Sequence, residues 1–122
     1  MKNIVMDLDN TISFKSDYAG YALAKPDMEI IEKLNQYKEL GFKIIIFSSR
    51  NMRTYKGSIG KINKFTLPEA MKWLEKYNVP YDEIIMGKPW CGNEGFYVDD
   101  KSIRPNEFKE LDLGEINKII NT

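Results

Sequence analysis

The sequence contains no histidine and only one cysteine, Cys91, among its 122 residues. Without histidine, the chain cannot form a Ser-His-Asp triad, a Cys-His dyad or a histidine-liganded metal site. One cysteine cannot form an intrachain disulfide, which favours a reducing compartment, so we expect a cytoplasmic protein. The chemistry left to this chain is that of carboxylates, lysine, arginine, hydroxyl groups and oxygen-bound metal ions.

Long apolar runs and an excess of one charge are also missing. No apolar stretch approaches the roughly 20 residues that a transmembrane helix needs, and Asp7 breaks the apolar start of the chain, so no signal peptide is predicted. Eighteen basic residues balance eighteen acidic ones. This balance gives no bulk attraction to nucleic acid or to an anionic membrane, and we expect neither as a partner.

The length is that of one ordinary domain, and we expect a single domain over residues 1–122. Apolar patterning predicts four strands, at 3–8, 43–47, 83–86 and 95–98. It predicts three helices, at 27–40, 67–77 and 115–120. Two long connections remain, at 10–26 and 49–66.

Local signals support several of these elements. Gly41 is a plausible cap after the helix at 27–40. Thr66 and Glu69 fit a capping box that would start the next helix, with Pro68 in its first turn. The run 44–47 is apolar without alternation, which is typical of a strand buried on both faces. The stripes that we expect to be buried are Ile30, Ile31, Leu34 and Tyr37 in the first helix, and Ala70, Met71, Leu74 and Tyr77 in the second.

Strands that alternate with helices indicate an α/β fold: a doubly wound, mainly parallel sheet with helices on both faces, in three layers. Such sheets bind ligands at the carboxyl ends of their strands. All four predicted strands end in polar residues, and we expect these ends to meet at one edge. The ends are Asp7-Leu8-Asp9, Ser48-Ser49-Arg50, Gly87-Lys88-Pro89 and Asp99-Asp100.

Carboxylates dominate two of these strand ends. Asp7 and Asp9 lie on one face if the strand conformation continues, and their mutual repulsion favours a bound divalent cation. Asp99 and Asp100 could bring a third carboxylate, and such oxygen-only ligation suits Mg²⁺. Any of these motifs taken alone also fits a simple turn or cap. Together they favour a chemical site.

Ser48 adds a hydroxyl group at a strand end and Lys88 adds a positive charge. Carboxylate, metal, hydroxyl and lysine are what an aspartyl-phosphate mechanism needs. The pattern resembles the haloacid dehalogenase-like (HAD) hydrolase superfamily, in which an Asp-x-Asp, a Ser or Thr, a Lys and an acidic pair follow successive strands. The longer stretches 51–54, 87–92 and 99–105 are similar to small HAD proteins linked to bacterial capsule biosynthesis.

The resemblance implies a HAD Rossmann-like core and a role for each matching residue. Asp7 would be the nucleophile, and Asp9 would be the general acid and then the general base. Ser48, Lys88 and Thr11 would contact the phosphoryl group.

The resemblance also implies a Mg²⁺ site. Asp7, the backbone carbonyl of Asp9 and Asp100 would hold the ion, with Asp99 beside them. Capless members of the superfamily often borrow cover from a neighbouring subunit, so the resemblance also implies a homo-oligomer.

A cap domain of the kind that many HAD enzymes carry does not fit in 122 residues. The segment 50–64 is instead strongly basic and contains no acid, which indicates either a solvated loop or a flap that gathers an anionic substrate. Arg50 is the better candidate for a substrate contact, and Arg104 is a weaker one because it could pair with Glu107.

We therefore expect a Mg²⁺-dependent phosphatase that hydrolyses a small phosphate monoester. The capsule-like resemblance points to a sugar or polyol phosphate, by association only. Two alternatives remain: a phosphoacceptor receiver-like signalling domain, and a catalytically idle binding protein. The receiver is disfavoured because Met86-Gly87-Lys88 stands where its acceptor aspartate should follow the third strand. Cys91 has no activating partner except nearby Lys88, and we give it no catalytic role.

Overall fold

The computed structural model describes residues 1–16 and 18–122. The chain divides into two compact units, residues 1–90 and residues 91–122, and each is described by itself. Among the described residues, no helix has the length and apolar character that crossing a bilayer requires. The prediction of one catalytic domain over the whole chain stays a prediction.

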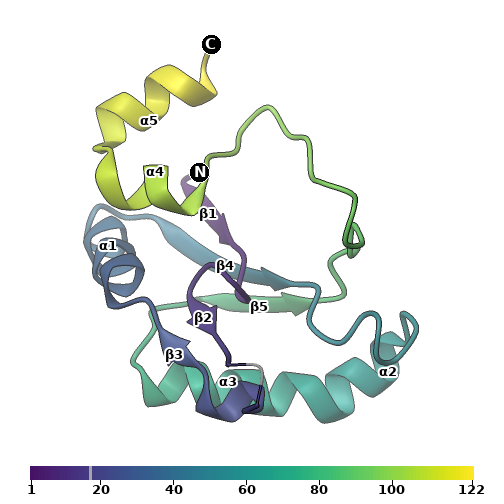
Figure 1. The fold of residues 1–122 in the computed structure, drawn as a ribbon. Coiled ribbons are helices and arrows are strands. Elements are labelled where there is room, and N and C mark those ends of the chain that lie inside the picture. The colour runs from purple at the N-terminus through teal and green to yellow at the C-terminus, as the bar shows by residue number, and fades with distance from the viewer. Residues whose placement is uncertain (17) are drawn as a thin grey trace. The chain divides into compact units, whose positions relative to one another are not determined.

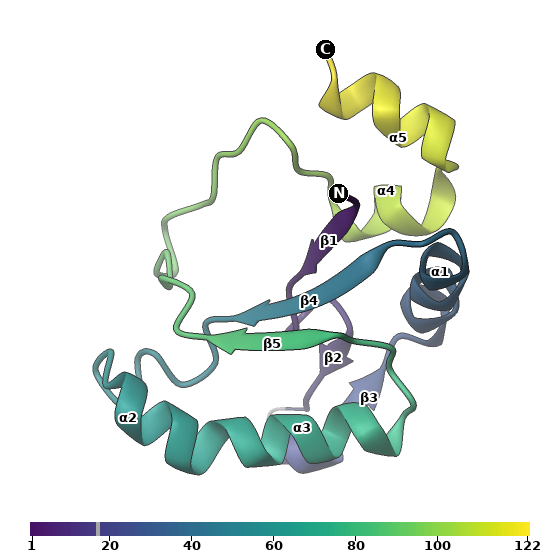
Figure 2. The same ribbon diagram turned by 180° about the vertical axis from the view of Figure 1, so that it is seen from behind.

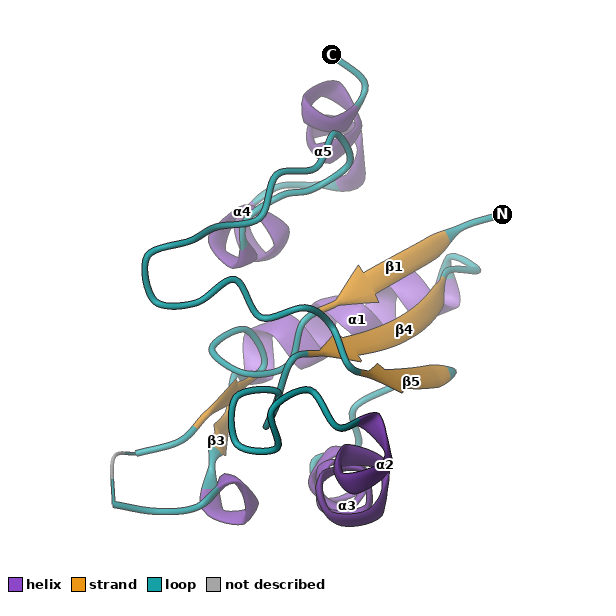
Figure 3. Ribbon diagram, turned by 90° about the vertical axis from the view of Figure 1, so that its right-hand side faces the viewer, coloured by secondary structure: helices purple, strands orange, loops and turns teal. Residues whose placement is uncertain are grey.

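The first unit is built on a three-stranded parallel sheet. Its strands are β1 (Asn3–Met6), β4 (Lys43–Ser48) and β5 (Glu83–Met86), in the order β1-β4-β5. The three arrows point the same way, so the strands end at one edge of the sheet (Figure 3). The α/β class and the first three predicted strands are confirmed. The convergence of their polar ends, on which the site prediction depends, is confirmed for these three strands.

Helix α1 (Met28–Glu39) lies on the connection between β1 and β4 and leads directly into β4 (Figure 1). The Asp27 side chain accepts hydrogen bonds from the backbone N–H groups of Glu29 and Ile30, which fixes the start of the helix. Gly41, just past its end, has a φ of +92°, which only glycine adopts readily. The four residues predicted for the buried stripe of this helix are all buried.

Burial alternates along the strands of the sheet. Ile44 and Ile46 are buried, whereas Ile45 between them is only half-buried. On the same face as Ile45, Val5 is 60% exposed and Ile85 is 46% exposed. The connections from β1 to β4 and from β4 to β5 advance across the sheet in one direction. Because such crossovers between parallel strands are right-handed, α1 and the later helix α3 (Leu67–Lys76) lie on the same face of the sheet. The prediction that β4 is buried on both faces is therefore wrong, and residues 1–90 by themselves form two layers.

The second helical segment begins earlier than predicted. A short helix α2 (Ile59–Lys61), a π-helical turn η2 (Ile62–Thr66) and α3 (Leu67–Lys76) form one continuous ribbon (Figure 2). The residue that caps this ribbon is Ser58, whose Oγ accepts from the Lys61 N–H. Thr66 has helical backbone angles and makes no cap, so the predicted capping box is wrong.

A proline explains the irregular turn. Pro68 has no N–H to give to the carbonyl of Lys64, where a regular α-helix would need that hydrogen bond. The π-helical turn directly precedes this point, so the helix continues through the proline. The Thr66 hydroxyl instead donates to Asn51 Oδ1 at 2.8 Å, which ties the helix to the segment after β4.

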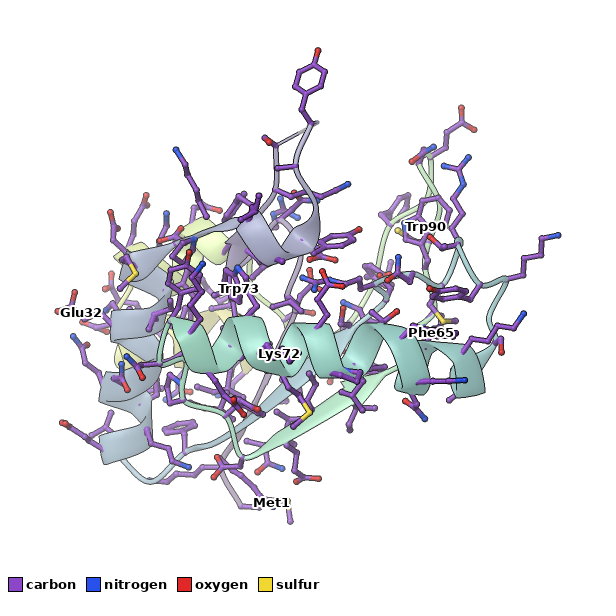
Figure 4. The ribbon with its side chains drawn as sticks, turned by 90° about the horizontal axis from the view of Figure 1, so that it is seen from below. Met1, Glu32, Phe65, Lys72, Trp73 and Trp90 are labelled. Atoms are coloured by element: carbon purple, nitrogen blue, oxygen red, sulfur yellow. The ribbon has the colours of Figure 1, made fainter. Side chains whose placement is uncertain are left out.

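The first long connection also has structure. Strands β2 (Ser13–Phe14) and β3 (Lys25–Pro26) pair as a small antiparallel hairpin, with a 3₁₀ turn η1 (Tyr21–Leu23) before β3. The buried Trp73 of α3 donates from Nε1 to the carbonyl of Ala24 at 3.0 Å. The neighbouring Lys72 is exposed, on the face of α3 that is turned to the viewer in Figure 4. The hairpin is thus anchored to the helix, and Trp73 belongs to the buried stripe although the pattern did not include it.

The second unit contains α4 (Pro105–Glu110) and α5 (Leu113–Ile120). The predicted C-terminal helix is confirmed, and a reciprocal capping box between Asp112 and Glu115 fixes its start. Helix α4 was not predicted. The strand predicted at 95–98 is wrong, because this segment pairs with no strand among the described residues. Its apolar side chains Phe96, Tyr97 and Val98 are exposed.

Candidate active site at the carboxyl edge of the sheet

A tight turn after β1 presents the two aspartates of the first motif. The carbonyl of Leu8 accepts hydrogen bonds from the N–H groups of Thr11, Ile12 and Ser13, and the Leu8 side chain is fully buried. Asp7 and Asp9 flank this anchored residue, so their positions are fixed by the turn. The backbone hydrogen bonds that close this turn all lie within residues 8–13, so the local sequence is enough to form it.

Asp7 lies beside a hydroxyl group and a cation. Thr11 Oγ1 donates to Asp7 Oδ2 at 3.0 Å, and Lys88 Nζ lies 3.7 Å from Asp7 Oδ1. Lys88 comes from the loop after β5, so two strand ends contribute to this contact. The structure thus brings together three of the residues predicted for the site.

Ser48 and Lys88 are joined through their backbones. The Lys88 N–H donates to the Ser48 carbonyl at 3.1 Å, and Ser48 is buried as the last residue of β4. The Ser48 Oγ accepts from the Arg50 N–H at 3.0 Å, which turns the chain after the strand. Gly87 has a φ of +88°, and a Cβ there would lie 2.6 Å from Ile59 Cδ1. The backbone that leads from β5 to Lys88 therefore requires glycine at position 87.

Asp9 is held by Arg50. The Arg50 Nε lies 3.2 and 3.1 Å from the two Asp9 carboxylate oxygens, and Nη2 lies 2.6 Å from Oδ1. Arg50 is only 3% exposed. It therefore differs from the other four basic residues of 50–64, all of which are exposed: Arg53, Lys56, Lys61 and Lys64.

Tyr21, from the hairpin, covers the other side of the arginine. The Arg50 Cζ lies 4.0 Å from the centroid of the Tyr21 ring. Burial raises the pKa of the Tyr21 hydroxyl above its ordinary value, the negative charge of Asp9 raises it further, and Arg50 opposes this. Sequence reasoning missed Tyr21, and no local signal distinguishes it from the exposed Tyr18 in the same connection.

Aromatic residues accompany the basic segment. Arg53 Cζ lies 5.8 Å from the centroid of the Trp90 ring, and the rings of Tyr55 and Phe65 lie 5.9 Å apart. Phe65 and Trp90 appear at the same end of the molecule in Figure 4. Cys91 begins the second unit, and its Sγ donates to the Gly92 carbonyl.

The acidic pair belongs to the second unit, where both residues are exposed. The Lys101 N–H donates to Asp99 Oδ1 at 2.9 Å, and this hydrogen bond, with one from Asp100, holds the pKa of Asp99 below its usual range. The meeting of this pair with Asp7 stays a prediction. Arg104 contacts Glu107 through its backbone N–H, which donates to Glu107 Oε1 at 2.8 Å, and no ion pair joins their side chains among the described residues.

The donor types of the first unit suit Mg²⁺. Among the described residues, no group of three or more His, Cys, Asp and Glu side chains is placed to hold a metal ion. Mg²⁺ nevertheless commonly binds proteins through one or two carboxylates, with waters and substrate phosphate oxygens completing its shell. Asp7 and the backbone carbonyl of Asp9 offer oxygen donors of this kind from one turn. The residues present therefore fit the ion that the motif implies.

Comparison with known proteins places the chain first by fold and then by family. Two solved structures share the α/β fold at 21% and 20% identity: chains of the Pnkp1/Rnl/Hen1 complex and of the Pnkp1/Rnl/Hen1 RNA repair complex. Their TM-scores are 0.54 and 0.53, and the matches cover 81% and 89% of this chain but 30% of each of those chains. Likeness at this level shows the fold alone.

A third solved structure is much more similar. The crystal structure of an MCSG target protein from Vibrio cholerae is 48% identical, with a TM-score of 0.95 over 99% of this chain and 98% of that chain. The chain therefore belongs to the same protein family as this Vibrio cholerae protein. No protein-family model and no curated protein matches the chain.

Proposed function

We propose that this protein is a Mg²⁺-dependent phosphatase of the HAD type that hydrolyses a small phosphate monoester. The observation that carries this proposal is the surroundings of Asp7, which lies at a sheet edge with Lys88 Nζ at 3.7 Å and a hydroxyl donor, Thr11, at 3.0 Å. A carboxylate beside fixed donors is what a nucleophile needs when it attacks a negatively charged phosphoryl group. The motif resemblance supports the same assignment.

In the proposed reaction, a carboxylate oxygen of Asp7 bonds to phosphorus, and the bond from phosphorus to the leaving oxygen breaks. Asp9 starts protonated and gives its proton to that leaving oxygen, which leaves Asp9 as the carboxylate that Arg50 contacts. Asp9 then takes a proton from water, which attacks the aspartyl phosphate, releases inorganic phosphate and restores Asp7. Lys88 and Thr11 contact the phosphoryl oxygens, and Ser48 shapes the loop next to them.

Bound Mg²⁺ would neutralise phosphoryl charge in this site. Asp7 and the Asp9 carbonyl would hold it from the first unit. The motif resemblance implies Asp100, with Asp99 beside it, as the further donors. The hydrogen bond from Lys101 occupies one oxygen of Asp99, which favours Asp100 as the direct ligand.

The substrate class is proposed from the capsule-like resemblance as a sugar or polyol phosphate. The four exposed bases of 53–64 would attract such an anion. The RNA repair complex is a property of the distant structural neighbours. The balanced charge of this chain gives no bulk attraction to nucleic acid. We also propose that the protein is cytoplasmic and that it forms a homo-oligomer in which a neighbouring subunit covers the site.

The test is a screen of phosphorylated metabolites and p-nitrophenyl phosphate, with Mg²⁺ and with EDTA. We expect turnover that needs Mg²⁺ and that Asp7→Asn abolishes while the circular dichroism spectrum is unchanged. Glu32→Gln, an exposed acid on α1 (Figure 4), is the matched control and should keep full activity. Full activity of Asp7→Asn would show that Asp7 is not the nucleophile.

The same screen separates the alternatives. Strand β5 ends at Met86, and the next residues are Gly87 and Lys88. The acceptor aspartate that a receiver domain carries after its third strand is therefore missing from this position. If no monoester is hydrolysed, the phosphatase proposal fails and phosphotransfer or phosphate binding becomes the better reading.

A further inference from the structure

Arg50 lies between side chains from two other segments of the first unit. Its guanidinium makes a two-pronged contact with the Asp9 carboxylate, at 3.1 Å or 3.2 Å from Nε and 2.6 Å from Nη2. The Tyr21 ring lies against the guanidinium, with its centroid 4.0 Å from Cζ. A planar fork that meets a carboxylate through two nitrogens fixes the direction of that carboxylate as well as its distance.

The arginine is itself held at its base. Its backbone N–H donates to Ser48 Oγ, and its side chain is only 1% exposed. The Tyr21 hairpin is held in turn by the hydrogen bond from Trp73 to Ala24. Three elements of the fold therefore fix the position of one carboxylate. An ordinary ion pair at the surface is exposed, contributes little to stability and is not held in this way by other elements of the fold.

One donor of this guanidinium is left over. Among the described residues, Arg50 Nη1 is buried and has no hydrogen-bond partner. Unpaired buried donors are destabilising and uncommon, so the fold holds this guanidinium against Asp9 and Tyr21 at a cost in stability.

We infer that Arg50, backed by the Tyr21 ring, is the positioning residue that directs the Asp9 carboxyl group toward the leaving oxygen of the substrate. This inference rests on the proposed phosphatase function and adds two residues to it. Arg50 acts through Asp9, and Tyr21 acts through Arg50. The hairpin, rather than a cap domain, supplies this aromatic cover.

The role has a measurable signature in the choice of leaving group. When an alkyl phosphate is cleaved, the leaving alkoxide needs the proton from Asp9 as its bond to phosphorus breaks. The p-nitrophenolate ion leaves without a proton because it is a weak base. A misdirected Asp9 therefore slows cleavage of alkyl phosphates far more than cleavage of p-nitrophenyl phosphate. Damage that is merely structural slows both alike.

The experiment measures kcat/KM for glycerol phosphate and for p-nitrophenyl phosphate with Mg²⁺, and takes their ratio. Arg50→Lys keeps the charge without the fork, and Tyr21→Leu removes the ring. We expect the alkyl-to-aryl ratio to fall about tenfold or more in Arg50→Lys, which is a part of the roughly 10²–10⁴-fold that a positioned proton donor contributes, and by less in Tyr21→Leu. Tyr18→Leu, the same change at an exposed tyrosine of the same connection, should leave the ratio unchanged. An equal fall for both substrates in Arg50→Lys overturns the inference.

A second measurement needs no turnover. The Nε–H proton of Arg50 should give a protected nitrogen-15 NMR resonance, because it is buried and bonded to Asp9. Asp9→Asn and Tyr21→Leu should both shift that resonance, and Tyr18→Leu should not. A resonance that exchanges freely with water overturns the inference even if the enzyme is active. The resonance could behave as expected while neither substrate is hydrolysed. The ion pair between Arg50 and Asp9 would then be shown, and the proposed phosphatase function would be overturned together with the positioning role that depends on it.

Discussion

Trp73 fastens the Tyr21 hairpin to α3, and its replacement gives the sharpest test of this architecture. In Trp73→Phe the ring still fills most of the site, but the N–H that donates to the Ala24 carbonyl at 3.0 Å is lost. Ala24 is 1% exposed and Trp73 is 2% exposed, so water does not replace the lost donor. A buried carbonyl left unpaired costs about 1–3 kcal/mol.

The missing ring atoms add a second cost. A small cavity beside the buried stripe of α3 destabilises by about 1 kcal/mol. We expect the free energy of unfolding to fall by about 2–4 kcal/mol, a large part of the 5–15 kcal/mol that is typical of a domain. At about 4 °C per kcal/mol for a chain of this size, the Tm should fall by roughly 8–16 °C.

Urea unfolding followed by circular dichroism measures this change, and the slope m should stay constant. Trp90→Phe is the matched control because it makes the same chemical change at a side chain that is 42% exposed. It should cost less than about 0.5 kcal/mol. Equal losses in the two variants would refute the reasoning, since burial and the hydrogen bond to Ala24 are what distinguish the two tryptophans.

Two further predictions concern the sheet and its edge. Asp82 pairs with Lys38 and accepts from the Ile44 N–H at 2.8 Å, and these contacts hold the pKa of Asp82 below its usual range of about 4. Its stabilisation is therefore present above about pH 4 and is lost as the pH falls through the lowered pKa. The stability gap between wild type and Asp82→Asn should be seen by urea unfolding at pH 6 and should shrink toward pH 2, and a gap that widens in acid would contradict this. Gly87→Ala should cost about 1–3 kcal/mol, because a left-handed backbone is strained for alanine. Adding Ile59→Val removes the 2.6 Å clash but not the strain, so a double variant with wild-type stability would show that φ is not the cause.

The parts of the fold that sequence predicted are those whose causes lie close together in the chain. Helix α1 carries its cap at Asp27, its buried stripe and its terminal Gly41 within fifteen residues. The polar ends of β1, β4 and β5 could be predicted to meet because parallel strands share an edge. The pairing of Asp7 with Lys88 follows from that edge, although 81 positions separate them in the sequence.

The parts that failed depend on distant partners. The segment 95–98 is apolar enough for a strand, but a strand forms only where a neighbour takes up its N–H and C=O groups. The sequence marks Arg50 only as the base that follows Ser48, and its burial against Asp9 and Tyr21 is seen only in the structure. No periodicity reveals such a contact, since it joins residues that are 41 and 29 positions apart.

The π-helical turn at Ile62–Thr66 determines how this helix can tolerate changes in length. Ile62, Thr66, Ala70 and Leu74 are buried at intervals of four residues, whereas an α-helix turns once in 3.6. Over twelve residues this mismatch would carry the stripe about a third of a turn away from the core. A turn closed by i→i+5 hydrogen bonds holds an extra residue and corrects part of that drift. Deletion of one residue from this turn would therefore rotate Ile62 by about 100° relative to Ala70 and Leu74, out of the buried stripe, even though each remaining residue could still be helical.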